Sequence, residues 1–535
     1  MSKTYTVTFL PQKKTIEVPE HTTILAAEQM AGLEPDAPCG GNGKCGKCKV
    51  DIVEGKKTGV VLACQTEVDS DLKVDTMFQE KVQKILIDGK ARKVEVDPGI
   101  VRKGPGSDRP SFLMAFDIGT TTVVGYLLDG KDGHETAVTS MMNPQHQFGA
   151  DVISRANYVL ENGGDQMRKV IVDALNQMIG KACAEAGIER EDVIQVSIVG
   201  NTCMHHLFLG ISPDSLVHAP YVPAVKDGMI KAPEEVGLKM NPKGRVIILP
   251  NIAGFVGADT VGCMLCVAFD QLEKMTLMID IGTNGELVMG NKEKMYTTST
   301  AAGPAFEGAK IECGMRGSRG AVSHLKVKDG KIVMEVVDQA KPIGICGSGL
   351  IDILAFLIRY GFVDTYGGFC DAEDLEDPVA KAESWRLQEL DGKPVFVLFP
   401  KEETGNGAPV YLSQKDIREV QLAKGAIAAG IQIMTEKLNI QPEDIQQVYL
   451  AGAFGNYMDA ANACEIGLIP YELKDRIIPI GNAAGEGSKL ACLNQGEYNY
   501  ACKMAKEAEF IELATESEFQ DVFVDKLEFS RAVER

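Results

Sequence analysis

The chain has 535 residues, of which 45% are hydrophobic and 24% are charged. This length is too great for one hydrophobic core, and the composition is that of a folded protein rather than a disordered or fibrous one. The 55 basic and 75 acidic residues give a net charge of −20, which repels phosphate backbones and anionic lipid surfaces. We therefore expect no nucleic acid and no membrane among its partners.

The N-terminus lacks the uninterrupted apolar stretch and small residues of a secretion signal. Without such a signal, the 14 cysteines favour a reducing compartment, in which thiols hold metals or pack in a core. We expect a cytoplasmic protein. The most apolar stretch, residues 246–269, is interrupted by Pro250, Asn251 and Asp259, which predicts a buried strand followed by a helix.

Residues 1–78 are predicted to form a small α+β domain. Residues 4–10 and 14–18 are short β-prone runs, which predict a hairpin, and residues 23–30 predict a helix. The glycine-rich residues 38–49 then suit a loop that wraps closely around a cofactor.

Four cysteines stand on and after this loop in the pattern C-x5-C-x2-C-x15-C. Three thiolates on a tight loop and a fourth from the following strand are what a [2Fe-2S] cluster needs. A structural zinc site is the main alternative, although zinc sites usually show two C-x2-C pairs. A role in packing alone is the weakest interpretation. The predicted metal ligands are Cys39, Cys45, Cys48 and Cys64.

Residues 79–111 are polar and dense in proline and glycine, which predicts a linker. From residue 112 onward, apolar strands alternate with helical stretches, a pattern typical of α/β architecture. Two strands end alike, in Asp117-Ile-Gly-Thr and Asp280-Ile-Gly-Thr. This duplication predicts two similar domains that face each other, over residues 112–275 and 276–535.

Each duplicated turn has groups that can hold nucleotide phosphates. A carboxylate ends a strand, and a glycine turn then presents amides and hydroxyls that can cradle phosphate while the carboxylate holds Mg²⁺. A third glycine turn, with Gly452 and Gly455, follows another strand. Two copies in register with a third turn favour a nucleotide site over ordinary hairpin turns.

In this order the turns resemble the phosphate-1, phosphate-2 and adenosine motifs of the sugar kinase, heat-shock and actin superfamily. The resemblance implies two RNase H-like domains that close over Mg-ATP, with Asp117 and Asp280 as catalytic, metal-side carboxylates. The residues expected at ATP are Gly119, Thr120, Thr121, Thr122, Gly282, Thr283, Asn284, Gly285, Gly452 and Gly455. Which carboxylate orients the attacking water stays open.

Other motifs have both a structural and a functional interpretation. Residues 344–349 and 481–487 each precede a helix, so their amides either bind an anion or cap the helix, and a structural role is favoured for the second. Packing is favoured for Cys263-Met-Leu-Cys266, which lies in an apolar stretch. The His205-His206 pair is expected to be packed and hydrogen-bonded, because no further ligand stands at a metal-binding spacing.

The whole chain resembles the reductive activators of corrinoid proteins of anaerobic methyl-transfer metabolism. The resemblance runs from the cluster loop through DIGTTT, GNTCMHH, LPNIAGFVGAD, DIGTNGE, AAGPAFEGAKIECGMR and LAGAFGN. It implies an α+β ferredoxin-like β-grasp domain followed by α/β duplicated RNase H-like ATPase domains. Family members use ATP to return cobalt from inactive Co(II) to the Co(I) nucleophile of methyl transfer.

These resemblances predict an ATP-hydrolysing iron–sulfur oxidoreductase with a [2Fe-2S] cluster, ATP and Mg²⁺. ATP can drive such a reaction only through a cycle in which a partner binds differently in each state. The expected partners are a corrinoid (cobalamin-binding) protein and a low-potential electron donor, and the oligomeric state stays open, a homodimer included. Residues 297–306 are a candidate surface for the cobalt, with an interdomain turn as the alternative.

Two other classes of protein stay open at this point. One is a small-molecule kinase with a regulatory iron–sulfur domain, and the other is a non-enzymatic ATP switch of the actin or heat-shock type. Phosphorylation of a sugar or a carboxylate is the signature of the first, and polymerisation or peptide binding is that of the second.

Overall fold

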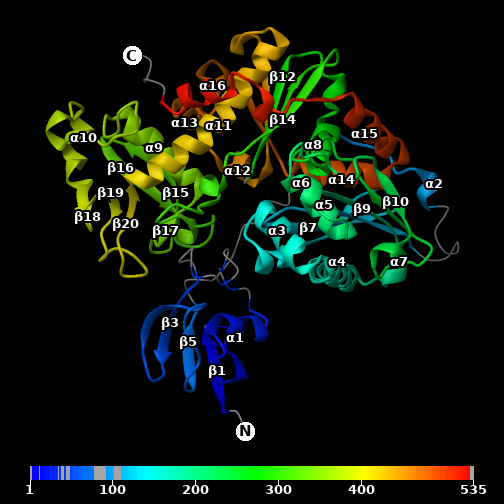
Figure 1. Ribbon diagram of the computed structural model, residues 1–535, viewed down its shortest axis with the longest axis horizontal. Coiled ribbons are helices and arrows are strands. Elements are labelled where there is room, and N and C mark those ends of the chain that lie inside the picture. The colour runs from blue at the N-terminus through cyan, green and yellow to red at the C-terminus, as the bar shows by residue number, and fades with distance from the viewer. Residues whose placement is uncertain are drawn as a thin grey trace. The chain divides into compact units, whose positions relative to one another are not determined.

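The computed structural model describes residues 3–10, 12–33, 35, 37, 41, 43, 48–76, 92–101, 110–282 and 284–529. The chain divides into two compact units. The N-terminal unit contains residues 1–83 and 145–158, and the larger unit contains residues 84–144 and 159–535. Figure 1 shows the helices and strands of both units.

The N-terminal unit has one sheet of five strands in the order β2-β1-β5-β3-β4. Its elements are β1 (Thr4–Leu10), β2 (Lys14–Pro19), α1 (Ile24–Met30), β3 (Lys49–Glu54), β4 (Gly59–Leu62) and β5 (Leu72–Asp75). β1 pairs with β5 in parallel, and the other pairs of this sheet are antiparallel. This arrangement confirms the predicted β-grasp domain.

Alternation of apolar residues builds the core of this sheet. Val7 and Phe9 of β1 are fully buried, whereas Thr8 between them stays partly exposed. Thr23 is the N-cap of α1, because its hydroxyl accepts a hydrogen bond from the backbone N–H of Ala26 (3.2 Å). The hairpin and the helix therefore begin where the sequence predicted them.

The larger unit has two six-stranded sheets of the same design. Their orders are β10-β11-β9-β6-β7-β8 and β22-β21-β12-β13-β14-β23. In each, three consecutive strands pair antiparallel, and the first of them also pairs in parallel with a later strand, β6 with β9 and β12 with β21. This repeat confirms the duplicated RNase H-like fold. Within the larger unit, we call the part that carries the first sheet (residues 112–144 and 159–275) the first subdomain and the part that follows it (276–535) the second subdomain.

The strands of the first sheet are β6 (Phe112–Ile118), β7 (Thr122–Asp129), β8 (Glu135–Met142), β9 (Val193–Gly200), β10 (Met229–Lys231) and β11 (Arg245–Ile248). Those of the second are β12 (Thr276–Ile281), β13 (Gly285–Gly290), β14 (Met295–Thr300), β21 (Gln447–Ala451), β22 (Ile477–Gly481) and β23 (Glu509–Phe510). Two small sheets lie between β14 and β21 in sequence, formed by β15 (Ala321–Lys328), β16 (Lys331–Val336) and β17 (Gly344–Ile345), and by β18 (Leu387–Leu390), β19 (Lys393–Phe399) and β20 (Val410–Ser413).

The helices from residue 92 to the end of the first subdomain are α2 (Pro98–Val101), α3 (Val152–Asn162), α4 (Asp165–Ala186), α5 (Thr202–Leu209), α6 (Asp214–Val217), α7 (Pro233–Val236) and α8 (Ala258–Val267). Those of the second subdomain are α9 (Gly347–Arg359), α10 (Pro378–Glu383), α11 (Gln414–Leu438), α12 (Gly452–Tyr457), α13 (Ala460–Glu465), α14 (Ala483–Leu493), α15 (Gln495–Glu507) and α16 (Phe519–Asp525). Within the described ranges, no helix combines the length and the apolar character needed to cross a membrane. The apolar stretch near residue 250 forms β11 and α8, as predicted.

Helices α8 and α14 lie between the two sheets and join them (Figure 1). α8 follows the first sheet, yet its buried side chains share a core with Met278 and Val288 of the second sheet. α14 follows the second sheet, yet Ser488 donates a hydrogen bond to the carbonyl of Phe116 in β6 (3.2 Å). Each helix therefore connects its own sheet to the other one.

Glycines bring these two helices into close contact. A Cβ atom on Gly487 of α14 would lie 2.0 Å from the carbonyl oxygen of Gly262 in α8. A Cβ atom on Gly262 would in turn lie 2.9 Å from the carbonyl oxygen of Ala484. Because a side chain has no room at either place, the crossing requires glycine in both helices.

The last part of the predicted linker, residues 92–101, packs against the larger unit. Val94 and Val96 contact the cores formed with α8 and α14. Arg92 forms a two-point ion pair with Glu497 of α15 and also donates to the carbonyl of Leu265 in α8 (3.4 Å). These residues therefore fasten the linker to α8 and α15.

Replacing Gly487 with alanine is expected to lower the free energy of unfolding by about 2 kcal/mol or more, because the new methyl group overlaps the backbone of α8. Gly180→Ala in α4 is the control, since a Cβ there would meet only the flexible side chain of Arg190. Urea denaturation followed by circular dichroism measures both variants. Equal stability of the two would contradict a close crossing of α8 and α14.

Candidate functional site

Cys48 and Cys64 lie close together at the open end of the β3–β4 hairpin. The backbone N–H of Ala63, which precedes Cys64, donates to the carbonyl of Cys48 (2.7 Å) just beyond the last paired residues of the hairpin. The side chain of Cys48 is buried, and that of Cys64 is half-buried. The structure thus brings two of the four predicted cluster ligands together.

The glycines of the loop fit a group held against these cysteines. Gly41 has a φ of +85°, and a Cβ on it would lie 3.8 Å from the Cβ of Cys64. Gly43 also has a left-handed φ, of +70°. Gly41 thus brings the loop backbone close to Cys64, as an iron–sulfur cluster requires, whereas Gly43 lies against the side chain of Gln65. Cys39 and Cys45 lie outside the described residues and stay predicted ligands.

Asp117 and Asp280 occupy equivalent places, each one residue before the end of the first strand of its sheet. Protein atoms surround both carboxyls, although solvent still reaches them. Burial raises the pKa of Asp117 to about 7, and the charge of Asp280 adds to this shift. Burial likewise raises the pKa of Asp280 to about 6. The fold therefore brings the two predicted carboxylates into one centre.

Both aspartates lead into tight turns, which we call the phosphate-1 turn (residues 119–122) and the phosphate-2 turn (residues 282–285). The backbone N–H of Gly119 donates to the carbonyl of Thr122 (2.9 Å), and that of Gly282 donates to the carbonyl of Asn284 (2.9 Å). Each turn is thus closed by a backbone hydrogen bond from its first glycine, which spans three residues in the phosphate-1 turn and two in the phosphate-2 turn. Thr283 lies outside the described residues.

Two further contacts fix the phosphate-1 turn from the side of the first subdomain. The side-chain amide of Asn201, which caps the start of α5, donates to the hydroxyl of Thr120 (2.8 Å). The carbonyl of Thr121 accepts from the backbone N–H of Asn143 (2.9 Å). The predicted phosphate-binding residues of this turn are therefore held in place by their neighbours.

The predicted glycines differ in what they approach. Gly452 has a φ of +80°, and a Cβ on it would lie 2.6 Å from Oδ1 of Asp280, so the third turn reaches the carboxylates. Gly455 packs on β21, where a Cβ would lie 2.9 Å from a strand side chain. A Cβ on Gly285 would lie 2.8 Å from a side chain of β14. The structure thus gives Gly455 and Gly285 a packing reason to be glycine.

Two carboxylates that the sequence analysis did not assign join this centre. Burial, with the charge of Asp280, raises the pKa of Asp259 at the start of α8 to about 7. Burial, followed by the charges of Asp259 and Asp280, also raises the pKa of Glu286 in β13. We call Asp117, Asp259, Asp280 and Glu286 the acidic centre. Glu286 directly follows the second turn motif, but only the fold shows that Asp259 lies beside it.

Each crossing helix also sends a side chain to one of the aspartates. Asn482, the N-cap of α14, hydrogen-bonds to Asp117 and so opposes the rise of its pKa. The Cys263 thiol of α8 donates to Oδ2 of Asp280 (3.8 Å). Cys263 and Cys266 are buried, as expected for packing. Residues 481–487, for which a structural role was favoured, therefore also contribute Asn482 to the site.

In the described part of the chain, no three carboxylate, imidazole or thiol groups converge closely enough to hold a metal ion by themselves. Mg²⁺ usually keeps several waters and binds one or two carboxylates together with phosphate oxygens. The acidic centre therefore suits a magnesium ion that arrives with a nucleotide.

The histidine pair is buried in α5, as the sequence predicted. Nδ1 of His206 donates to the carbonyl of Thr202 (2.7 Å), and its Nε2 accepts from the backbone N–H of Ala224 (3.2 Å). Burial lowers the pKa of His205 to about 3, so its ring is neutral. His206 is thus packed and hydrogen-bonded, whereas the ring nitrogens of His205 have no hydrogen-bond partner among the described residues.

The raised pKa values make the nucleotide-free protein less stable as the pH rises. The unfolded chain ionises these carboxyls near pH 4, whereas the folded chain binds their protons more tightly. Between about pH 6 and pH 8, the ionisation of Asp117 and of Asp259 should each lower the free energy of unfolding by about 1 kcal/mol.

Urea denaturation across this pH range tests the effect by comparing the unchanged protein with Asp117→Asn. The comparison cancels the contribution of other groups, such as Lys424, whose burial lowers its pKa to about 7 and acts in the opposite direction. We expect the loss of stability with rising pH to be smaller in the variant. Parallel pH curves for the two proteins would contradict the electrostatics described for Asp117.

Comparisons with known proteins agree with this geometry. Residues 7–69 match the 2Fe-2S iron-sulfur cluster binding domain, residues 112–272 match the RACo middle region, and residues 274–534 match the C-terminal domain of RACo, the ASKHA domain. The chain therefore combines a [2Fe-2S] domain with an ATP-binding domain of the actin and sugar kinase type.

The relatives that match carry related names. The chain is 33% identical to the corrinoid activation enzyme RamQ of Eubacterium limosum, over 95% of this chain and 96% of that protein. It is 24% identical to the [Co(II) methylated amine-specific corrinoid protein] reductase of Methanosarcina barkeri, over 78% of this chain and 76% of that one. A solved structure named reductive activator for corrinoid, iron-sulfur protein is 31% identical over 98% of both chains, with a TM-score of 0.69. The chain belongs to the family of ATP-dependent reductive activators of corrinoid proteins.

Proposed function

We propose that this protein uses ATP to reduce a corrinoid protein, passing one electron from a low-potential donor through its [2Fe-2S] cluster so that Co(II) becomes Co(I). The observation that carries this proposal is the combination, in one chain, of a cysteine hairpin that fits a cluster and a centre that receives carboxylates from two duplicated sheets. A simple electron carrier does not need the second feature, and a simple kinase does not need the first. The names of the relatives support the same assignment.

In the N-terminal unit, the role of the chain is to hold the redox centre. Cys48 and Cys64 supply two thiolates from the end of the β3–β4 hairpin, and Cys39 and Cys45 are the predicted third and fourth ligands. When bound, the [2Fe-2S] cluster supplies a centre that accepts and donates one electron. Gly41 keeps the loop backbone close enough for its amides to stabilise the reduced form.

In the larger unit, ATP is proposed to bind with its phosphates between the phosphate-1 and phosphate-2 turns and its nucleoside near Gly452. Asp117 and Asp280 lie where they can hold Mg²⁺, directly or through water, because each ends its strand beside one of the turns. The ion offsets the repulsion between the acidic centre and the phosphates. Asp259 and Glu286 are then available to orient a water molecule, because both belong to the same centre.

ATP binding affects both subdomains at once, since the acidic centre takes Asp117 from the first and Asp280 from the second. The crossing helices also take part, because Asp259 begins α8 and Asn482 begins α14. A nucleotide that binds one arrangement of the subdomains more tightly shifts their equilibrium, and a partner that prefers that arrangement then binds more tightly as well. This differential binding is the route by which ATP would drive an unfavourable electron transfer.

Most hydroxyls of the predicted cobalt-facing loop, residues 297–306, are not available to a partner. Thr297, Thr298 and Thr300 are buried in β14, and the hydroxyl of Thr298 donates to the carbonyl of Ile511 (2.9 Å). Ser299 is only half-buried. An approach to cobalt from this segment is therefore restricted to Ser299 and the residues that follow β14.

Replacing Asp280 with asparagine is expected to weaken Mg²⁺-dependent ATP binding by at least about 10-fold, because an amide cannot neutralise the ion. Isothermal titration calorimetry with Mg-ATP, and with ATP in the presence of EDTA, measures this effect. Asp270→Asn is the control, since Asp270 hydrogen-bonds to Tyr500 away from the centre. If Asp280→Asn bound Mg-ATP as tightly as the control, Asp280 would not be a metal-side carboxylate.

Replacing Cys64 with alanine is expected to abolish the [2Fe-2S] spectrum and the ATP-dependent conversion of Co(II) to Co(I) while leaving Mg-ATP affinity within about 2-fold, because the cysteine lies in the other compact unit. Electron paramagnetic resonance of the dithionite-reduced protein and the Co(I) absorption band of a corrinoid protein give the readouts. Cys370→Ala, at a half-buried thiol of the second subdomain, is the control.

The same assay tests the function as a whole. The unchanged protein, a low-potential donor and a Co(II) corrinoid protein are expected to form Co(I) with ATP and much less without it. If no Co(I) formed with the corrinoid proteins that the named relatives reduce, the proposal would be wrong, and stoichiometric phosphorylation of a sugar or carboxylate would favour a kinase instead.

A further inference from the structure

The segment of residues 303–317 connects the two phosphate turns. Glu307 lies beside the phosphate-2 turn, because a Cβ on Gly282 would lie 3.9 Å from its Oε1. Near the other end of the segment, Nη1 of Arg316 lies 3.5 Å from Sδ of Met142 in β8. A segment of the second subdomain therefore places a guanidinium against a strand of the first.

Met142 lies directly beside the phosphate-1 turn. It pairs with Thr122 across β7 and β8. The next residue, Asn143, donates its backbone N–H to the carbonyl of Thr121 (2.9 Å) and its side-chain amide to the carbonyl of Gly119 (2.8 Å). The Arg316 guanidinium thus contacts Met142, and Met142 pairs directly with Thr122 of the turn that is predicted to hold phosphate.

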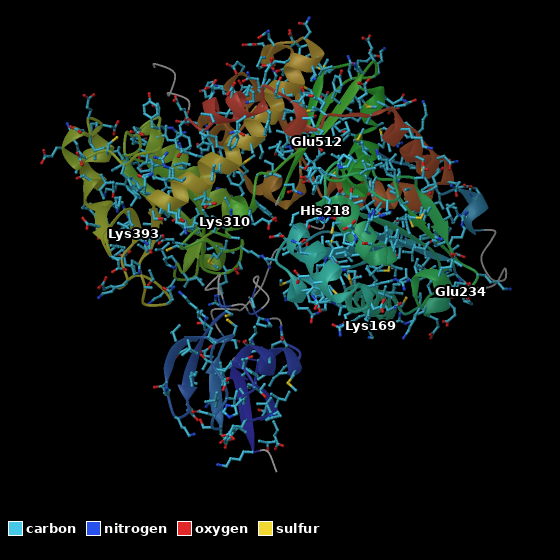
Figure 2. All side chains as sticks on the ribbon, in the orientation of Figure 1. Lys169, His218, Glu234, Lys310, Lys393 and Glu512 are labelled. Atoms are coloured by element: carbon cyan, nitrogen blue, oxygen red, sulfur yellow. The ribbon has the colours of Figure 1, made fainter. Side chains whose placement is uncertain are left out.

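The segment is tightly folded, which fixes where Arg316 can reach. Gly308 has a φ of +76°, and a Cβ on it would lie 2.5 Å from the carbonyl oxygen of Met315, so the two backbones are in contact. Lys310, labelled in Figure 2, forms an ion pair with Glu419 of α11 (3.4 Å). Glu307 directly precedes Gly308, and Arg316 directly follows Met315. Since the backbones of Gly308 and Met315 are in contact, Glu307 and Arg316 start from neighbouring points of the segment.

Arg316 has no counter-charge among the described residues. Its guanidinium contacts the thioether of Met142, which is a weak acceptor without charge, and no carboxylate of the described chain lies within ion-pair distance of it. The side chain is half-buried, so water only partly solvates the charge. An arginine in this state is suited to a phosphate, which its planar guanidinium can bind through two hydrogen bonds.

We propose that Arg316 binds the terminal phosphate of ATP and thereby joins the two subdomains only when that phosphate is present. This inference rests on the ATP site proposed above. In the nucleotide position proposed above, the phosphates lie between the phosphate-1 and phosphate-2 turns, and Arg316 lies beside the phosphate-1 turn through its contact with Met142. It would therefore meet the phosphate end of the nucleotide. ADP lacks the phosphate that Arg316 would hold. A guanidinium in this place also stabilises the charge of the phosphoryl group during hydrolysis.

Equilibrium binding of Mg-ATP and Mg-ADP to the full-length protein tests this role. Arg316→Ala is expected to weaken Mg-ATP binding by about 10-fold or more and Mg-ADP binding by less than about 3-fold, and to slow ATP hydrolysis by at least about 100-fold. Arg316→Lys should restore part of the ATP affinity, because it keeps the charge but loses the two-point geometry. The matched control is Arg319→Ala, which removes an exposed arginine of the same loop and should change neither affinity.

The preference for ATP over ADP decides the outcome. If Arg316→Ala weakened both nucleotides equally, or neither, Arg316 would not hold the terminal phosphate. Retained ADP affinity in the variant also shows that its site is folded. If the unchanged protein failed to bind Mg-ATP, the ATP site itself would be wrong, which distinguishes failure of the proposed function from failure of this inference.

Discussion

The close crossing of α8 and α14 is the contact on which the larger unit depends. With Gly262 against the start of α14 and Gly487 against Gly262, the helices meet backbone to backbone between the sheets. This contact sets the distance between the two sheets and therefore between Asp117 and Asp280. It also aims the two helix starts, with Asp259 and Asn482, at the same place. A larger residue at the crossing would separate the sheets and with them the acidic centre, although it touches none of the carboxylates.

The cost of this arrangement is electrostatic. The acidic centre holds four carboxyls, and burial raises the pKa of each. The ionised carboxylates are poorly solvated and repel one another, and protonation lowers this unfavourable energy. In the proposed function, a magnesium ion that enters with the nucleotide would lower it in another way, by supplying positive charge. If magnesium and ATP bind as proposed, this electrostatic cost favours the arrangement of the subdomains that holds them. Arg316, which has no carboxylate of the described residues within ion-pair distance, likewise favours an anion beside the phosphate-1 turn.

Sequence patterns predicted the elements whose signal is local. The β-prone runs of residues 4–10 and 14–18, the helix of residues 23–30 and the repeated Asp117 and Asp280 motifs each depend on neighbouring residues. The duplicated fold follows from the repeat, and the β-grasp fold was implied by the family resemblance. The residues that were missed depend on contacts across the fold. Asp259 and Asn482 looked like ordinary helix starts, and their nearness to the aspartates arises only when α8 and α14 cross. Arg316 ends one of the motifs that carried the family resemblance, but its position beside Met142 of the other subdomain follows only from the fold. Gly455 and Gly285 were predicted to be glycine because of ATP, but the fold shows that close packing against neighbouring strands also requires glycine at both positions.

The attachment of residues 92–101 changes how the linker is understood. The sequence predicted a spacer that ends where β6 begins, but the two-point pair of Arg92 with Glu497 and the packing of Val94 and Val96 fix the chain to α8 and α15 well before that strand. The attachment of the chain to the larger unit therefore begins at residue 92 or before, within the stretch that the composition predicted to be a linker. Since α8 accepts a hydrogen bond from Arg92 and also carries Asp259, the attachment point of residues 92–101 and one carboxylate of the acidic centre belong to the same helix. A change in the position of α8 would therefore move this attachment point and a carboxylate of the acidic centre together.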